Sequence, residues 1–313
     1  KPLATTSPPT SRFIPSKPIP KQTPPQTKTK HKIIDPYPQR TYIGRALLCL
    51  VCDLGGQSKM AVSMRYALVR PVPESYDHCV RTSIEPISVD HAKRQHKEYC
   101  KLLEQLGLQL IWVEGDNALP DSCFVEDTAF VLDEKAIICN MSVKSRAPEV
   151  IAVTDVMAEL KETHRIKSPA MVDGGDVLRI QDRILIGLSA RTNSHAVEQV
   201  KKILTGTSLK VVRTKVHNVL HLKSACTYLG DNCVILSKGN FDTTVLSGLR
   251  KIIVAKGEEY AADCLAVNGT VLMAKGYPKT KRLIQNEGFR VKELEMSEFR
   301  KGEGALTCLS IIW

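Results

Sequence analysis

The sequence contains no apolar run of the length that crosses a membrane. An N-terminal run, ALLCLVC at residues 46–52, has only seven residues. A membrane-spanning helix needs about 20 apolar residues, so this run is too short. We therefore expect no transmembrane anchor and no membrane partner.

An excess of positive charge is also missing from most of the chain. The net charge is +11 over 313 residues, but residues 1–59 hold ten Lys and Arg against two acids. Residues 60–313 hold the remaining 34 Lys and Arg against 31 acids. This near balance gives no reason to expect a nucleic acid partner.

The first 59 residues differ from the rest in composition. They contain ten of the 17 prolines and too few apolar side chains to offset the entropy of an ordered chain. We predict a disordered, basic, proline-rich leader over residues 1–59 and one globular domain over residues 60–313. The leader fits either a mitochondrial transit peptide or an over-long gene model in which Met60 is the true start. The second interpretation predicts a cytoplasmic protein.

Closely spaced metal-binding cysteines are lacking as well. Cys49 and Cys52 form a single CxxC without a second pair, and the body has no closely spaced His/Cys ligand pairs. A structural zinc site needs about four such ligands, so we predict no metal and no cofactor. The other eight cysteines are scattered, several of them in apolar segments, which is typical of reduced, buried thiols.

What the body does contain is a repeat that is visible in outline. Four stretches have two apolar arms around a short polar turn, the pattern of a β-hairpin. Their starts are 48, 49 and 39 residues apart, and such periods indicate a repeat architecture. The stretches are TAFVLDEKAIIC from Thr128, DVLRIQDRILIG from Asp176, ACTYLGDNCVIL from Ala225 and CLAVNGTVLMA from Cys264.

Segments with helical spacing lie between the hairpins, and several are followed by another short apolar strand. The predicted unit is therefore strand, strand, helix, strand, with five helical segments if residues 241–255 are included. Two single strands, MRYALVR (64–70) and LTCLSIIW (306–313), stand at opposite ends of the body. Paired with each other they would supply a fifth hairpin and close a ring, because open sheet edges are unfavourable.

Reactive groups collect directly before the first strand of these hairpins. In a closed ring these positions face one another across the axis, so a thiol, an imidazole and carboxylates would converge there. Cys308, His221 and Asp173 match a thiol nucleophile, the histidine that activates it and the carboxylate that orients the histidine. The segments are DSCFVED (121–127), VDGGD (172–176), VLHLKS (219–224) and GEGALTC (302–308).

Three further acids, Asp121, Glu126 and Asp127, stand in the first of these segments. Orienting one histidine ring does not require so many carboxylates, so they indicate a cationic substrate. Zinc is the rival use of such a cluster, but the His/Cys spacing of a zinc site is missing.

Five motifs, in this order and at these separations, resemble the dimethylarginine dimethylaminohydrolase family. The resemblance runs from about Tyr66 to the end of the chain. It implies an α/β fold, a five-bladed propeller of strand-strand-helix-strand units around a central pocket, and a catalytic domain over residues 60–313. The motifs are LPDSCFVED (119–127), DGGDVL (173–178), GLSARTN (187–193), LHLKS (220–224) and GALTCLS (304–310).

The resemblance also implies roles for single residues. Cys308 would be the nucleophile, His221 the general acid and base, and Asp173 the partner of the histidine. The acids Asp121, Glu126 and Asp127 would bind the guanidinium group of a methylated arginine. The remaining expected substrate contacts are Arg146 and Arg191 at the carboxylate, and Val72 in a loop that closes over the substrate.

The sequence departs from the family pattern at Gly302 and Glu303, where an apolar residue and an aspartate are expected at the pocket edge.

Two alternatives to the hydrolysis of methylated arginines remain open. One is an arginine deiminase-type enzyme acting on free arginine or agmatine, although Arg146 and Arg191 favour a substrate with a carboxylate. The other is a propeller that binds a ligand without catalysis. No oligomeric state is predicted.

Overall fold

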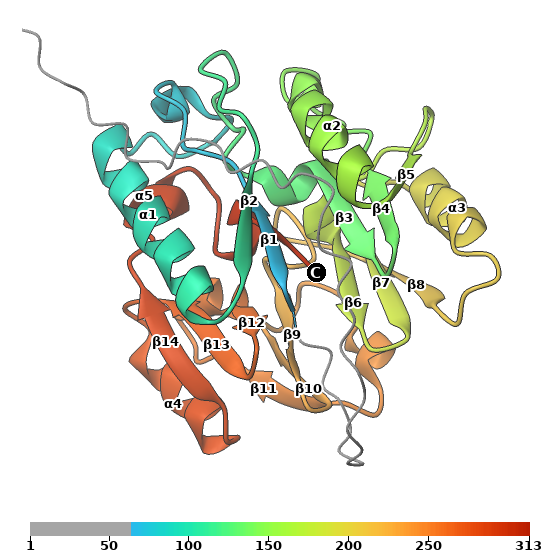
Figure 1. Cartoon of the computed structure of the whole chain (residues 1–313). Helices are drawn as coiled ribbons and strands as arrows, with labels where there is room; N and C mark the ends of the chain where they lie inside the picture. The colour runs from blue at the N-terminus through green and yellow to red at the C-terminus, as the bar shows by residue number, and fades with distance from the viewer. Residues whose placement is uncertain (1–63) are drawn as a thin grey trace, which may run out of the picture. The chain divides into compact units, whose positions relative to one another are not determined.

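The computed structural model describes residues 64–313. The predicted leader over residues 1–59, Met60, Cys49 and Cys52 lie outside the described residues. Within the described range, five three-stranded sheets are present, which confirms the predicted α/β propeller (Figure 1). None of the helices of residues 64–313 combines the length and the apolarity that a membrane span requires.

Each sheet consists of an antiparallel pair and a third strand that runs parallel to the middle one. In chain order, the strands are β1 (Tyr66–Val69), β2 (Gln109–Trp112), β3 (Ala129–Leu132), β4 (Lys135–Ile138), β5 (Glu162–Arg165), β6 (Val177–Ile180), β7 (Arg183–Leu188), β8 (Lys210–Lys215), β9 (Cys226–Gly230), β10 (Cys233–Leu236), β11 (Arg250–Ile253), β12 (Leu265–Val267), β13 (Thr270–Ala274), β14 (Arg290–Leu294) and β15 (Ile311–Ile312). The sheets are β15-β1-β2, β3-β4-β5, β6-β7-β8, β9-β10-β11 and β12-β13-β14.

The four predicted hairpins are the pairs β3-β4, β6-β7, β9-β10 and β12-β13, and each turn contains a residue with positive φ. Asn268 and Gly269 at φ 44° and 77° make the turn between β12 and β13, as the Asn-Gly pair predicts. The fifth hairpin joins the two ends of the body. Ala67 and Leu68 of β1 pair antiparallel with Ile312 and Ile311 of β15, which confirms the predicted closure.

The parallel crossovers are covered by helices α1 (Val89–Gln105), α2 (Val150–Leu160), α3 (Ser194–Ile203) and α4 (Pro278–Asn286) (Figure 1). The side chains of Ser88 and Asn193 accept hydrogen bonds from the first turns of α1 and α3, which fixes where these helices begin. The fourth crossover is a correction to the sequence analysis. Residues 241–255 form only the 3-10 turn η5 (Thr243–Leu246) and β11, because β-branched and glycine residues there disfavour a helix.

Buried apolar side chains fill the space between the sheets and the helices in three clusters. The strands β15, β3, β6, β9 and β12 lie at one edge of their sheets and border one another, for example β6 against β9 and β9 against β12. They are the inner strands of the ring. The residues that lead into them therefore come together at its centre.

Candidate active site

The segments before the inner strands are short turns that pack against one another. The 3-10 turn η2 (Val125–Thr128) precedes β3, η4 (Gly174–Asp176) precedes β6, and η7 (Thr307–Leu309) precedes β15. Turn η2 contacts both η4 and η7. The repeat thus brings together residues that are far apart in the sequence.

Two glycines permit this close approach. A Cβ atom on Gly174 would lie 2.0 Å from the carbonyl oxygen of Glu126, and one on Gly175 would lie 2.7 Å from His221 Nδ1. Both distances are shorter than any real contact of a Cβ atom, so a side chain at either position would push η2, η4 and His221 apart. The DGGD motif is therefore a packing requirement of the site.

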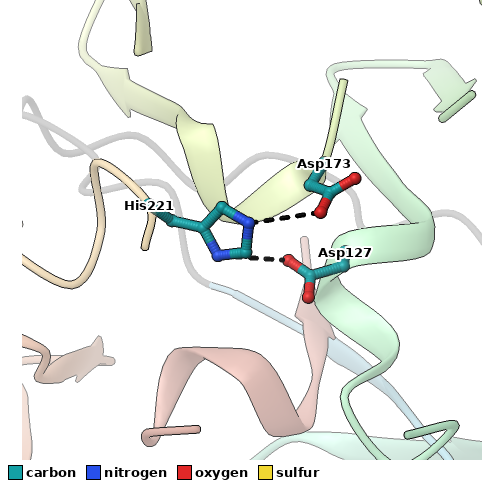
Figure 2. A group of neighbouring side chains, drawn as sticks. All are labelled: Asp127, Asp173 and His221. Atoms are coloured by element: carbon teal, nitrogen blue, oxygen red, sulfur yellow. Dashed lines mark hydrogen bonds and ion pairs between the residues drawn. The ribbon is translucent and has the colours of Figure 1, made fainter. Parts of the chain in front are cut away.

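His221 lies between two carboxylates that come from different turns (Figure 2). Its Nε2 is 3.2 Å from Asp173 Oδ2 and its Nδ1 is 3.7 Å from Asp127 Oδ1. Burial by itself lowers the pKa of His221, but Asp127 and Asp173 outweigh it and raise the pKa to about 9. The imidazole is therefore protonated at neutral pH and can donate a proton.

Asp127 is held by a buried arginine. Arg146 Nη1 lies 2.8 Å from Asp127 Oδ2, and its other nitrogens bind both oxygens of Glu149 and the carbonyl of Phe124. Burial by itself raises the pKa of Asp127, but His221 and Arg146 lower it below its ordinary value. Asp127 thus keeps its negative charge beside the imidazolium.

Asp173 is fully buried and has a second cationic neighbour. Arg191 Nη1 lies 3.3 Å from Asp173 Oδ2, the same oxygen that faces His221. Asp173 Oδ1 accepts no hydrogen bond from any residue within 64–313. Arg191 is a looser partner than Arg146, since this single long contact is its only side-chain hydrogen bond or ion pair to the rest of the described chain.

The other two predicted acids are buried close by. The carboxylate of Asp121 accepts the backbone N–H of Val80 at 3.1 Å, and Glu126 Oε1 lies 2.6 Å from Lys223 Nζ. Burial raises the pKa of both acids. Glu126 is therefore already paired with a lysine, whereas Asp121 has only a backbone partner.

Cys308, in η7, is half-buried and faces a small cavity among these groups. Burial raises the pKa of its thiol, and the charges of Asp263, Asp127 and Glu126 raise it further. The thiol is therefore protonated at neutral pH. The cavity is lined by Val80, Asp121, Phe124, Asp127, Arg146, Arg191, Leu220, His221, Gly302, Glu303, Gly304 and Cys308.

Gly302 and Glu303 form one edge of the cavity. A Cβ atom on Gly302 would lie 2.3 Å from the hydroxyl of Tyr76, so no larger residue fits without rearrangement. Glu303 adopts a positive φ of 61° and its Oε1 accepts the backbone N–H groups of Thr82 and Ser83. This glutamate thus fastens the segment that follows Val80 to the cavity edge.

The structure places most of the predicted site residues on or beside the cavity. Glu126 and Asp173 lie behind it, each in contact with a residue of the site. Val72 is different, because it is packed in the core while Val80, eight residues further on, lines the cavity. The assignment of Val72 to a loop that closes over the substrate stays a prediction, and Val80 is the valine of this segment that lines the cavity.

Besides Val80, the sequence analysis did not name Phe124, Leu220 and Gly304, which line the cavity, or Lys223 and Asp263, which contact residues of the site. Phe124, Leu220, Gly304 and Lys223 stand inside quoted motifs, but their roles depend on partners from other blades. Asp263 precedes the hairpin that starts at Cys264, so its place in the repeat was a usable signal.

In residues 64–313, one group of side chains has the spacing of a metal site. Ligand atoms of Asp127, Asp173 and His221 lie within 4.8 Å of one another. Arg146 and Arg191 bind the same two carboxylates, and their positive charges oppose a second cation there. The group is better suited to holding a protonated histidine than a metal ion.

Comparisons with known proteins show which family this chain resembles. Residues 117–264 match the family model for arginine deiminase. The dimethylarginine dimethylaminohydrolase of Streptomyces coelicolor is 36% identical over 250 residues, which cover 78% of this chain and 95% of that protein. The enzyme of the same name from Pseudomonas aeruginosa is 32% identical over 226 residues, covering 71% and 89%.

Solved structures give the same result. A cysteine-to-serine variant of the Pseudomonas aeruginosa enzyme in complex with citrulline has a TM-score of 0.77 at 28% identity and covers 80% of this chain and 100% of that one. The N-terminal domain of ArgZ, a cyanobacterial arginine dihydrolase, shares the fold with a TM-score of 0.73 at 20% identity, covering 80% and 97%. The chain therefore belongs to the dimethylarginine dimethylaminohydrolase family, within the superfamily of guanidine-modifying enzymes, and is a hydrolase of amidine carbon–nitrogen bonds.

Proposed function

We propose that this protein hydrolyses Nω-methylated arginines, asymmetric dimethylarginine and monomethylarginine, to citrulline and dimethylamine or methylamine. The observation that carries the proposal is the cavity at Cys308, which joins a thiol, a protonated histidine and the carboxyl groups of Asp121 and Asp127 in one small space. The relatives from Streptomyces and Pseudomonas support the substrate class.

In the proposed reaction, the cationic guanidinium group enters beside Asp121 and Asp127. Its positive charge lowers the pKa of the Cys308 thiol, which releases its proton to water and attacks the guanidinium carbon. The carbon–nitrogen bond to the methylated nitrogen breaks, and His221 donates its proton to the departing amine. A covalent thiouronium group remains on Cys308.

The second half of the reaction reverses the role of His221. As a neutral imidazole it takes a proton from water, and the resulting hydroxide attacks the thiouronium carbon. The carbon–sulfur bond breaks, the electron pair returns to sulfur, the proton of the added hydroxyl group passes to the sulfur and restores the thiol, and citrulline leaves. Asp173 and Asp127 orient the ring in both steps and stabilise its charged form.

We assign the amino acid's carboxylate to Arg191. Its guanidinium group is at the cavity and has only one long contact, so it can turn towards a ligand. Arg146 was expected to share this role, but its nitrogens are taken up by Asp127, Glu149 and Phe124. We therefore propose that Arg146 holds Asp127 in place instead.

The test uses the full chain and a Cys308→Ser variant, each incubated with asymmetric dimethylarginine, monomethylarginine or arginine. Mass spectrometry follows citrulline and the released amine. Equal amounts of citrulline and dimethylamine from the wild type alone are the expected result. The variant should fold with a loss below about 3 kcal/mol and show at least a thousandfold lower turnover.

Two other outcomes would overturn the proposal. Citrulline from free arginine alone would identify a deiminase, an activity consistent with the matched arginine deiminase model. If none of the three substrates gives a product but ligand binding is retained, the protein is a propeller that binds a ligand without catalysis.

A further inference from the structure

Asp263 occupies the one equivalent position of the ring to which the proposed mechanism gives no role. Glu126, Asp127, Asp173 and His221 stand two to five residues before an inner strand. Asp263 stands two residues before β12, directly after the 3-10 turn η6 (Glu259–Ala262). The fifth blade thus also presents a titratable side chain at the centre.

The carboxyl group of Asp263 is directed at the turn that carries the nucleophile. Its Oδ1 accepts the backbone N–H of Thr307 at 3.2 Å, and its Oδ2 is 3.3 Å from Thr307 Oγ1. Thr307 is the first residue of η7 and the neighbour of Cys308. Two hydrogen bonds from one rigid side chain fix both the backbone and the rotamer of this residue.

The surroundings of Asp263 are closed to water and already negative. Only 3% of the residue is exposed. The ionisable groups around it are Glu126 of η2, Lys223 before β9, Tyr260 of η6, the thiol of the next residue Cys264 and the thiol of Cys308 in η7. Of these, only Lys223 is a cation, and it is paired with Glu126.

We propose that Asp263 is a positioning residue of the reaction: it holds the η7 turn through Thr307, and its charge controls how readily the Cys308 thiol ionises. The inference rests on the proposed function in taking Cys308 as the nucleophile. Burial and the neighbouring Glu126 raise the pKa of Asp263 to about 8. The carboxyl is thus largely neutral at pH 7, where it still accepts the Thr307 N–H and can donate its own proton to Oγ1.

Above pH 8 the same group becomes an anion beside the thiol. A negative charge at Asp263 raises the pKa of Cys308, which adds to the effect of burial. The thiolate therefore forms less readily at alkaline pH than it would without this residue. Ionised Asp263 thus opposes formation of the Cys308 thiolate, whereas protonated Asp263 does not.

Two variants separate the two parts of the role. Asp263→Asn keeps one acceptor and one donor for Thr307 and cannot ionise, whereas Asp263→Ala removes both hydrogen bonds. Glu258→Gln is the matched control, because Glu258 binds the N–H groups of Lys279 and Thr280 at the start of α4 in the same way, at the outer side of the blade. The Glu258 variant should leave turnover and the pH profile unchanged.

The first readout is the alkylation rate of Cys308 by iodoacetamide between pH 6 and 9.5, resolved from the other cysteines by peptide mass spectrometry. Asp263→Asn should match the wild type at pH 7 within about twofold and exceed it by about threefold to tenfold at pH 9. If the pH profiles of alkylation of the wild type and of Asp263→Asn coincide, the charge of Asp263 does not control ionisation of the Cys308 thiol. This readout needs no turnover, so it stands even if methylarginine hydrolysis is not observed.

The second readout is kcat and KM for asymmetric dimethylarginine at pH 7. Asp263→Ala should lower kcat at least tenfold with KM within about threefold, and Asp263→Asn should restore most of it. Equal kcat values for wild type, Asn and Ala would overturn the positioning role. If the Ala variant does not fold, Thr307→Val against Thr307→Ser makes the same comparison, since only serine keeps the hydroxyl group.

Discussion

At the scale of single residues, the two arginines of the site differ in how firmly they are held. Arg146 is buried and binds two carboxylates, whereas Arg191 makes one contact at 3.3 Å. A buried charge left without its partner destabilises a protein strongly, and a partly free cation does not. Removal of Arg146 should therefore mainly lower stability, whereas removal of Arg191 should mainly weaken substrate binding.

We expect Arg146→Ala to lower the free energy of unfolding by about 3–5 kcal/mol, because Asp127 and Glu149 would remain buried without their cation. Arg191→Ala should change it by less than about 1 kcal/mol and raise KM for asymmetric dimethylarginine by about tenfold or more. Urea unfolding and initial-rate kinetics measure both. Arg191→Lys, which keeps the charge, should recover part of the lost affinity. A stable Arg146→Ala protein with a raised KM would instead show that Arg146 binds the carboxylate of the substrate.

The raised pKa of His221 predicts a dependence of stability on pH. Its folded-state pKa of about 9 lies above the ordinary value of about 6.5. Its favourable interaction with Asp127 and Asp173 is thus fully present below pH 6.5 and is lost as pH rises through 9. The difference corresponds to at most about 3 kcal/mol.

The measurement is urea unfolding at pH 6 and pH 9.5 for the wild type and for His221→Gln. The wild type should lose up to about 3 kcal/mol more than the variant over this interval. Asp263 titrates in the same interval in both proteins, so its contribution cancels in the comparison. An equal loss in both would show that His221 is not protonated at neutral pH in the folded state.

At the scale of elements, the short turns before the inner strands decide the geometry of the site. Turn η4 can approach η2 and His221 only because Gly174 and Gly175 have no side chain. Gly175→Ala should therefore lower kcat at least a hundredfold by displacing the His221 ring, which a Cβ atom would meet at 2.7 Å. Gly115→Ala is the control, since its Cβ atom would meet only Pro71 at an ordinary 3.6 Å. Full activity of Gly175→Ala would mean that the ring can move without loss.

The same elements explain how much could be read from the sequence. The hairpins were predictable because apolar arms and turn residues such as Asn268-Gly269 are local signals. The convergence of Asp173, His221 and Cys308 was predicted from the repeat, and their roles were implied by the family motifs. The crossover at η5 was not predictable from its apolar residues, since a short apolar stretch does not distinguish a helix from a strand.

Most of the pairing of charges could not be predicted, because it depends on contacts between segments that are far apart in the sequence. Arg146 and Glu149 form a local pair three residues apart, but nothing local indicates that Arg146 also binds Asp127, or that Lys223 binds Glu126 from a different blade. Each is one cation among many in the sequence, and only the fold selects its partner. The position of Val80 at the cavity could not be predicted either, since the segment between β1 and α1 has no repeating pattern.

At the scale of residues 64–313 as a whole, the ring is closed by the two ends of the domain. Strand β1 lies between β15 and β2, and the rings of Tyr66 and Trp313 stack with their centroids 5.6 Å apart. The turn residue Asn268 adds a second connection, because its side chain binds both backbone groups of Met64 and the carbonyl of Leu106. Closure therefore joins the first blade to the last one through backbone and side chains.

Deletion of residues 311–313 should open this ring. The buried side chain of Ile311 and the stacked ring of Trp313 would be lost, at a cost of about 3–5 kcal/mol in the free energy of unfolding. The exposed edge of β1 would also favour association between molecules. Calorimetry and analytical ultracentrifugation measure the two effects, and Trp313→Phe, which retains an aromatic ring, is the control. Because Cys308 lies three residues before the deleted segment, turnover should fall together with stability. An unchanged melting transition with full activity would show that the propeller does not depend on the β1-β15 pair.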